Sequence, residues 1–128
     1  MSVHIVRLGS PRGRKEGLRI GTVRRPPRGV PRDRFSSDDW YDVWLPLLAP
    51  SASLVRLAKS AGTEKARVDF ARRYRSEMAL PEASRVLDLL AALSHGTDFA
   101  VGCYCHDETR CHRSILRQLL LERGARVR

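Results

Sequence analysis

The segment from Cys103 to Ser114 holds most of the side chains in this chain that could do chemistry. It reads Cys-Tyr-Cys-His-Asp-Glu-Thr-Arg-Cys-His-Arg-Ser, and it contains all three cysteines of the sequence. Thiols, imidazoles and guanidinium groups at such close spacing suit three kinds of site. These are an anion-binding pocket, a reactive thiol and a metal centre.

The first interpretation is an anion-binding pocket. Arg110 and Arg113 are three residues apart, so they share one face of a helix, and free N–H groups at a helix N-terminus favour an anion. Arg24 and Arg28 of an earlier loop would complete the pocket. The expected ligand is a phosphate-bearing small molecule or a nucleotide.

The second interpretation is thiol-dependent catalysis. A cysteine near a helix N-terminus, with arginine and histidine beside it, has its thiolate form favoured. The candidate nucleophiles or redox thiols are Cys103, Cys105 and Cys111, and the candidate bases are His112 and His106. A nucleophilic thiol needs such a base or a lowered pKa. The sequence leaves open whether the protein is an enzyme.

The third interpretation is a metal centre. Cys103, Cys105, Cys111 and His112 supply four ligands of the types that zinc accepts. Their spacing, C-x-C-x5-C-H, differs from the paired C-x2-C of zinc ribbons. We expect Cys111, His112 and Arg113 in one helical turn, each about 100° from the next. They would then not all face one site, so we expect no metal and no other cofactor.

The charge of the chain points to anionic partners. The formal net charge is +10, and 21 of the 24 basic residues are arginine. Residues 1–34 contain ten basic and only two acidic residues, concentrated in the loops 9–17 and 24–34. A nucleic-acid-binding module is therefore an alternative function. No aromatic residue is interleaved with residues 1–34, which leaves little for base stacking there.

Length and composition exclude several classes of protein. The 128 residues suit a single domain, 1–128, and 42% hydrophobic with 30% charged residues is normal for a folded chain. No apolar run approaches the roughly 20 residues of a membrane span, so no membrane partner is expected. Three clustered cysteines favour reduced thiols in the cytoplasm over a disulfide framework.

The apolar pattern predicts a small sheet flanked by helices. We expect strands over 3–8, 18–23 and 98–105, of which the last is the clearest, and an extended, proline-stiffened loop over 24–31. Helices are predicted for residues 40–47 after an N-cap region at 36–39, 51–61, 63–80, 82–94 and the stretch after 111 up to Gly124. This order favours a single compact α/β domain with a mostly parallel sheet. The cysteine segment then lies at the carboxyl end of the best strand, where such sheets bind ligands.

Several short motifs follow one another in a characteristic order. They are Gly17-Leu18-Arg19, Pro26-Pro27-Arg28-Gly29, Trp44 with Ala49-Pro50-Ser51, Phe70 with Arg73-Tyr74 and Glu77, and a strand ending in Cys103 before Cys111-His112-Arg113. Over roughly residues 3–122 this order resembles the bacterial domain-of-unknown-function 488 family, and in particular its YeaO-like branch. The resemblance implies a compact α/β domain with the Arg28 loop near the Cys111–Arg113 turn.

Overall fold

Four parallel strands form one sheet in the computed structural model, which describes residues 1–60, 62–108 and 111–128. The strand order is β1-β4-β2-β3. The bounds are β1 (Val3–Arg7), β2 (Leu18–Gly21), β3 (Val43–Trp44) and β4 (Phe99–Cys103). β4 lies between β1 and β2, with Phe99 opposite both Val3 and Leu18. The predicted α/β fold with a parallel sheet is confirmed.

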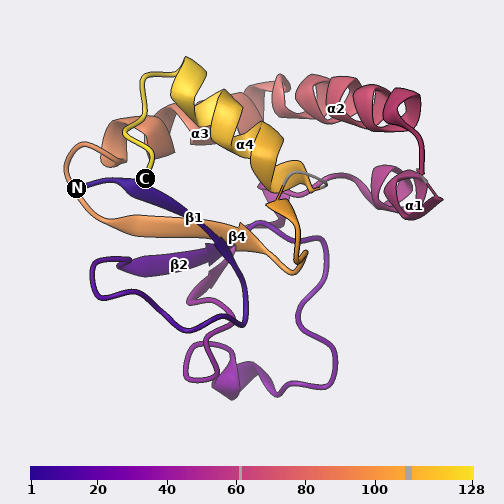
Figure 1. Cartoon of the computed structure of the whole chain (residues 1–128). Coiled ribbons are helices and arrows are strands. Elements are labelled where there is room, and N and C mark those ends of the chain that lie inside the picture. Colours follow the sequence, from indigo (N-terminus) through magenta and orange to yellow (C-terminus); the bar gives the residue numbers. More distant parts are fainter. Residues whose placement is uncertain (61, 109–110) are drawn as a thin grey trace.

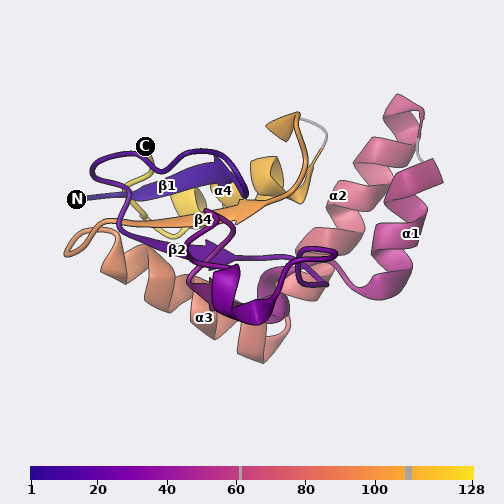
Figure 2. The ribbon, with the colours of Figure 1, turned by 90° about the horizontal axis from the view of Figure 1, so that it is seen from below.

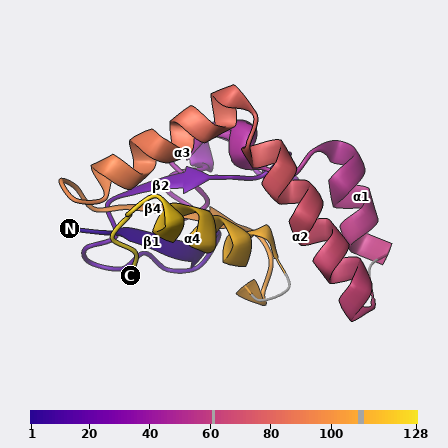
Figure 3. The same ribbon diagram turned by 90° about the horizontal axis from the view of Figure 1, so that it is seen from above.

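The helices of the described residues are α1 (Ala52–Ser60), α2 (Glu64–Met78), α3 (Pro81–Leu93) and α4 (His112–Glu122), with short 3-10 turns η1 (Arg32–Arg34) and η2 (Pro46–Leu48). Of these, α3 and α4 cover one face of the sheet. Figure 1 shows α3 and α4 above the sheet and the long loop after β2 below it. The α1 and α2 pair extends from one end of the sheet (Figures 2 and 3). No helix among the described residues is long and apolar enough to cross a membrane.

β4 is the centre of the core because it has a strand on each side and helices over it. All five of its residues are buried, which explains the apolar run in the sequence. The main core includes Phe99 and Val101 of this strand, together with Leu116 and Leu120 of α4. A second, smaller cluster contains Leu8, Val23, Tyr41, Cys103 and Cys111. This second cluster brings the chemistry-bearing segment into the interior.

Local signals in the sequence place most helix ends correctly. The Thr63 hydroxyl accepts a hydrogen bond from the N–H of Ala66 at 3.1 Å, so Thr63 caps α2 as predicted. Pro81 begins α3 at its first turn, where its missing N–H costs nothing. Gly124, with φ +80°, follows α4. On α3, Leu87, Leu90 and Ala91 are buried, whereas Leu93 is exposed.

The helix predicted for residues 40–47 is wrong. Val43 and Trp44 form β3 and pair with Ile20 and Gly21 of β2. Asp39, with φ +64°, turns the chain before this strand rather than capping a helix. The apolar side chains of this stretch do not share a buried helix face, because Val43, Trp44 and Leu47 are exposed and Tyr41 is buried. The Tyr41 ring lies over Gly21, where an added Cβ would come within 2.4 Å of it.

A glycine pair tests the close approach between β2 and β4. Gly17 and Gly29 have similar left-handed φ values, +73° and +76°, but a Cβ on Gly17 would lie 2.0 Å from the Asp98 carbonyl oxygen. An added Cβ at Gly29 would meet nothing within 4 Å. Gly29→Ala should therefore cost only the strain of the left-handed backbone, about 1 kcal/mol of unfolding free energy. Gly17→Ala should cost about 1–3 kcal/mol more because of the clash. Urea unfolding of the two variants measures the difference, and equal costs would contradict the described packing.

Candidate functional site

Three of the predicted site residues converge where β4 ends and α4 begins. The Cys103 and Cys111 sulfurs lie 2.7 Å apart, and the Cys111 sulfur lies 3.5 Å from Nδ1 of His112. The ligand atoms of these three buried side chains all lie within 4.8 Å of one another. All three cysteines of the chain are free thiols, and Cys105 is the exposed one.

The expectation that Cys111, His112 and Arg113 occupy one helical turn is wrong. Cys111 has φ −129° and ψ 157°, which is extended backbone, and α4 begins one residue later at His112. The 100° spacing of a helix therefore does not apply between Cys111 and His112. Their side chains can face the same point, and the steric objection to a shared metal ion is removed.

The ring of His112 is held in one orientation by the end of β2. Its Nε2 lies 2.8 Å from the carbonyl oxygen of Thr22, which can only accept a hydrogen bond. Nε2 therefore carries the proton, and Nδ1 presents its lone pair to Cys111. The Tyr74 ring packs edge-on against the imidazole, with ring centroids 5.4 Å apart. Burial lowers the pKa of His112 to about 4, so the ring is neutral at physiological pH.

The three thiols share hydrogen bonds, and this sharing divides their acidities. Hydrogen bonds with Cys103 and Cys111 hold the pKa of Cys105 far below its ordinary value. Hydrogen bonds with Cys105 and Cys111, and then burial, raise the pKa of Cys103. A hydrogen bond with Cys103 lowers the pKa of Cys111, but one with Cys105 and burial raise it to about 11. Of the three thiols, only the exposed Cys105 has its pKa lowered.

Arg113 is a buried cation that forms no ion pair with a carboxylate of the described residues. Its side chain is only 3% exposed, and its Nη2 donates to the Cys105 carbonyl at 2.6 Å. Its Nε finds no acceptor among the described residues, and no ion pair joins Arg113 to a carboxylate in that part of the chain. A buried guanidinium is costly unless a negative charge compensates it. Its positive charge favours the thiolate of Cys105.

The other predicted anion-binding residues are not gathered with Arg113. The Arg24 guanidinium donates to the carbonyls of Pro46, Ala49 and Pro50 at 3.0–3.3 Å. Arg28 is exposed and makes no hydrogen bond with the described residues. Arg110 lies outside those residues. The composite anion pocket therefore stays a prediction.

The 24–34 loop nevertheless reaches the cysteine segment. The Tyr104 hydroxyl donates to the Arg25 carbonyl at 2.8 Å. His106, the alternative base, lies beside Arg7, whose Nη2 is 3.0 Å from its Nε2. This contact joins Arg25 to Tyr104, and the expected proximity of Arg28 to the Cys111–Arg113 turn stays a prediction.

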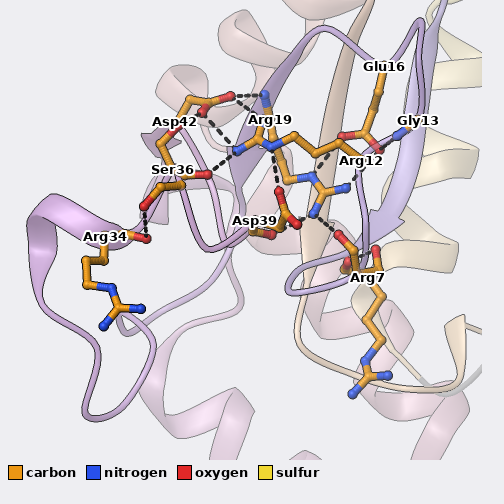
Figure 4. Close-up of polar contacts among 11 residues, drawn as sticks. Arg7, Arg12, Gly13, Glu16, Arg19, Arg34, Ser36, Asp39 and Asp42 are labelled. Carbon is orange, nitrogen blue, oxygen red and sulfur yellow. Dashed lines mark hydrogen bonds and ion pairs between the residues drawn. The ribbon is translucent and has the colours of Figure 1, made fainter.

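Part of the basic N-terminal quarter is structural. Arg19 is fully buried and forms a two-pronged ion pair with Glu16, both contacts at 2.8 Å. Arg12 binds Asp39 and both oxygens of Asp42. Figure 4 shows this network, with the guanidinium groups of Arg7 and Arg34 extending away from it. Arg12 and Arg19 therefore hold loops together and are not available to a ligand.

The carboxylate of Asp42 should make stability depend on pH. Burial raises its pKa, but hydrogen bonds from Arg12, Ser36 and the backbone N–H of Arg19 lower it from 3.8 to about 2. The folded state favours the charged form of Asp42. The carboxylate therefore stabilises the fold at pH values above its unfolded pKa, and this stabilisation is lost as pH falls from about 5 to 2. Asp42→Asn should flatten the acid dependence of urea unfolding, whereas exposed Asp33→Asn should not. An unchanged slope in Asp42→Asn would contradict the assignment.

Two residues that contribute to this site, Thr22 and Tyr41, were not among the predicted site residues. Thr22 orients His112, and Tyr41 packs beside Cys103 and Cys111 with its hydroxyl buried. Thr22 directly follows β2, and residues at the carboxyl ends of parallel strands are the usual site builders. That rule points to Thr22. Tyr41 has no comparable signal, because its place depends on the turn at Asp39.

A comparison with known protein families agrees with the order of motifs in the sequence. Residues 3–124 match the family model DUF488-N3a, which is described as the active DUF488-N3 subclade. The chain belongs to the DUF488 family. The match runs from β1 to just beyond α4, so the DUF488 region includes both the basic loops and the cysteine segment. The YeaO-like branch within DUF488 stays a prediction. The chain matches no curated protein and no solved structure.

Proposed function

We propose that this DUF488 protein binds a zinc ion through Cys103, Cys105, Cys111 and His112, and that this metal–thiolate centre is its functional site. The observation that carries the proposal is the convergence of the donor atoms of Cys103, Cys111 and His112 within 4.8 Å. Cys105, which interacts with both other thiols, would add the third sulfur and the fourth ligand. Three thiolates and one imidazole form a ligand set typical of zinc.

The orientation of His112 supports this proposal. A histidine that binds a metal usually donates its other ring N–H to a carbonyl or carboxylate, which fixes the tautomer. Thr22 supplies that carbonyl, and Nδ1 is left to face the sulfurs. Zinc–sulfur bonds of about 2.3 Å hold tetrahedral sulfurs about 3.8 Å apart. The ion would therefore separate Cys103 from Cys111.

The charge of Arg113 also supports it. Three thiolates and a neutral imidazole around Zn²⁺ carry a net charge of −1. Arg113 is buried beside them, donates to the Cys105 carbonyl and pairs with no carboxylate in the described part of the chain. The guanidinium thus supplies the single positive charge that the occupied centre requires. Cys105 is the exposed ligand, so its side of the ion is the one that a substrate can reach.

The presence of metal can be tested on protein purified without added zinc. Elemental analysis should give about one zinc per chain, and Cys111→Ser and His112→Ala should lose it. His95→Ala is the matched control, because His95 is exposed and bonds only the Gly124 carbonyl among the described contacts. Purified protein free of zinc that also fails to take it up on titration would overturn the proposal.

A second candidate function is thiol-dependent catalysis by Cys105. Its exposure favours it, since Cys103 and Cys111 are buried. Iodoacetamide labelling read by mass spectrometry separates the two candidates. A metal centre predicts that all three cysteines are protected until a chelator is added. Fast labelling of Cys105 in untreated protein, unaffected by added zinc, supports the thiol function instead.

The expected cytoplasmic location and the description of the family fit both a metal centre and a reactive thiol. Three free cysteines fit a reducing compartment such as the cytoplasm. The description of the matched subclade as active is in line with a working site in this chain.

A further inference from the structure

A pocket lined by Tyr41 opens beside β3. Its volume is about 590 Å³, within the range of small-molecule sites. The loop after β2, the segment around Phe35 and β3 itself form its walls. The lining side chains used below are Pro26, Arg32, Asp33, Phe35, Tyr41 and Trp44. None of them belongs to the proposed metal centre.

Aromatic rings form one side of this pocket. Trp44 is 43% exposed, although its indole N–H is fixed by a 2.8 Å hydrogen bond to the Val23 carbonyl. Phe35 and Tyr41 meet edge to face, with centroids 5.2 Å apart. A large exposed ring held in place by its own N–H is a ready platform for a planar ligand. The sequence could not show this, because the aromatic residues follow the basic quarter in the chain.

The hydroxyl of Tyr41 has no hydrogen-bond partner in the part of the chain that the structure describes. Tyr41 is 3% exposed, and its oxygen has no hydrogen bond among the described residues. A buried polar group normally finds a partner, since leaving one unpaired is costly. The ring cannot retreat toward the sheet, because it already lies against Gly21. A ligand in the pocket that Tyr41 lines would supply the missing acceptor or donor.

Exposed arginines lie on the loop that forms one wall of the same pocket. Arg25, Arg28 and Arg32 are exposed, and none forms an ion pair with the described carboxylates. Arg32 lines the pocket and acts electrostatically on Tyr41. The three belong to one loop stiffened by Pro26, Pro27 and Pro31, which limits the entropy lost on binding. Guanidinium groups of this kind suit phosphate.

We propose that this pocket binds a nucleotide unit, with its base against Trp44 and Tyr41 and its phosphate on Arg32 and Arg28. An aromatic surface can stack against a base, and neighbouring arginines can bind its phosphate. A nucleotide uses both features at once. Asp33, which also lines the pocket, offers acceptors for the amino or hydroxyl groups of the nucleotide. The inference does not depend on the metal centre, and zinc-free protein should bind the nucleotide as well.

The test uses adenosine 5′-monophosphate as the probe, with adenosine and inorganic phosphate as partial ligands. Calorimetric titration of the full chain should show that the nucleotide binds at least tenfold more tightly than either part. A single-stranded oligonucleotide forms a further arm. If the oligonucleotide binds more tightly than the mononucleotide, the ligand is a nucleic-acid strand. If it binds equally or more weakly, the ligand is a free nucleotide.

Variants identify the pocket as the site. Trp44→Leu should weaken binding about tenfold, because stacking on an aromatic ring contributes on the order of 1–3 kcal/mol per base. Arg32→Gln should weaken binding of the nucleotide and leave the affinity for adenosine unchanged. Arg14→Gln is the matched control, since Arg14 is an exposed arginine of the other basic loop.

Tyr41→Phe provides a test that does not disturb packing. It removes only the unpartnered hydroxyl, so the variant should fold at least as stably as the parent while binding the nucleotide more weakly. Nucleotide affinity that is unchanged in both Tyr41→Phe and Trp44→Leu would overturn the proposal. So would inorganic phosphate that binds as tightly as the nucleotide.

Discussion

Replacing His112 with alanine is expected to abolish the response of thermal stability to zinc. In the parent chain, zinc at about 100 times its Kd should add about 2.7 kcal/mol to the free energy of unfolding. For a domain of this size that corresponds to a rise in Tm of about 10 °C. His112 supplies the only nitrogen in the ligand cluster found among the described residues, so His112→Ala should show little of this rise.

The control separates loss of metal from loss of packing. His112 is buried against Tyr74, so its removal also leaves a cavity that lowers Tm by itself. The informative quantity is therefore the difference in Tm between zinc and chelator, measured within each variant. His95→Ala should keep the full difference. A parent chain whose Tm is the same in zinc and in chelator contradicts the metal assignment.

Glu16→Gln is expected to be the most destabilising single change among the charged residues. Arg19 is fully buried, and Glu16, 5% exposed, is the only carboxylate that pairs with its guanidinium within the described contacts. Removing the carboxylate leaves an uncompensated buried charge, which costs about 3–5 kcal/mol. That is a large share of the roughly 5–15 kcal/mol that stabilises a domain.

An exposed ion pair of the same spacing provides the comparison. Glu64 and Arg67 are also three residues apart, but the Glu64 side chain is 81% exposed. Glu64→Gln should therefore change the unfolding free energy by less than about 0.5 kcal/mol. Urea unfolding at neutral pH measures both variants. A cost below 1 kcal/mol for Glu16→Gln would show that Arg19 is not held as described.

The strands around the site could be predicted from sequence because their signals are local. β4 is a short apolar run, and Thr63 and Pro81 mark helix ends through chemistry that needs no tertiary context. β3 could not be predicted in this way. It is two residues long, and its place depends on the turn at Asp39 and on pairing with β2.

The same distinction applies to the candidate site. The cysteines and His112 could be identified from residue type and spacing alone. Their mutual geometry could not, because counting Cys111 into the helix shifts its side chain by about 100°. α4 begins only at His112, and this one-residue difference brings the sulfur and the imidazole together. The sequence also does not distinguish structural arginines from those that can face a ligand. Arg19 is buried in the core, whereas Arg32 lines a pocket.

X-ray absorption at the zinc edge tests the central claim most directly. Protein loaded with one equivalent of zinc should show three sulfur ligands at about 2.3 Å and one nitrogen at about 2.0–2.1 Å. Cys105→Ser should reduce the sulfur count to two without loss of the nitrogen. A first shell of oxygen and nitrogen atoms without sulfur would contradict the assignment of Cys103, Cys105, Cys111 and His112 as the metal ligands.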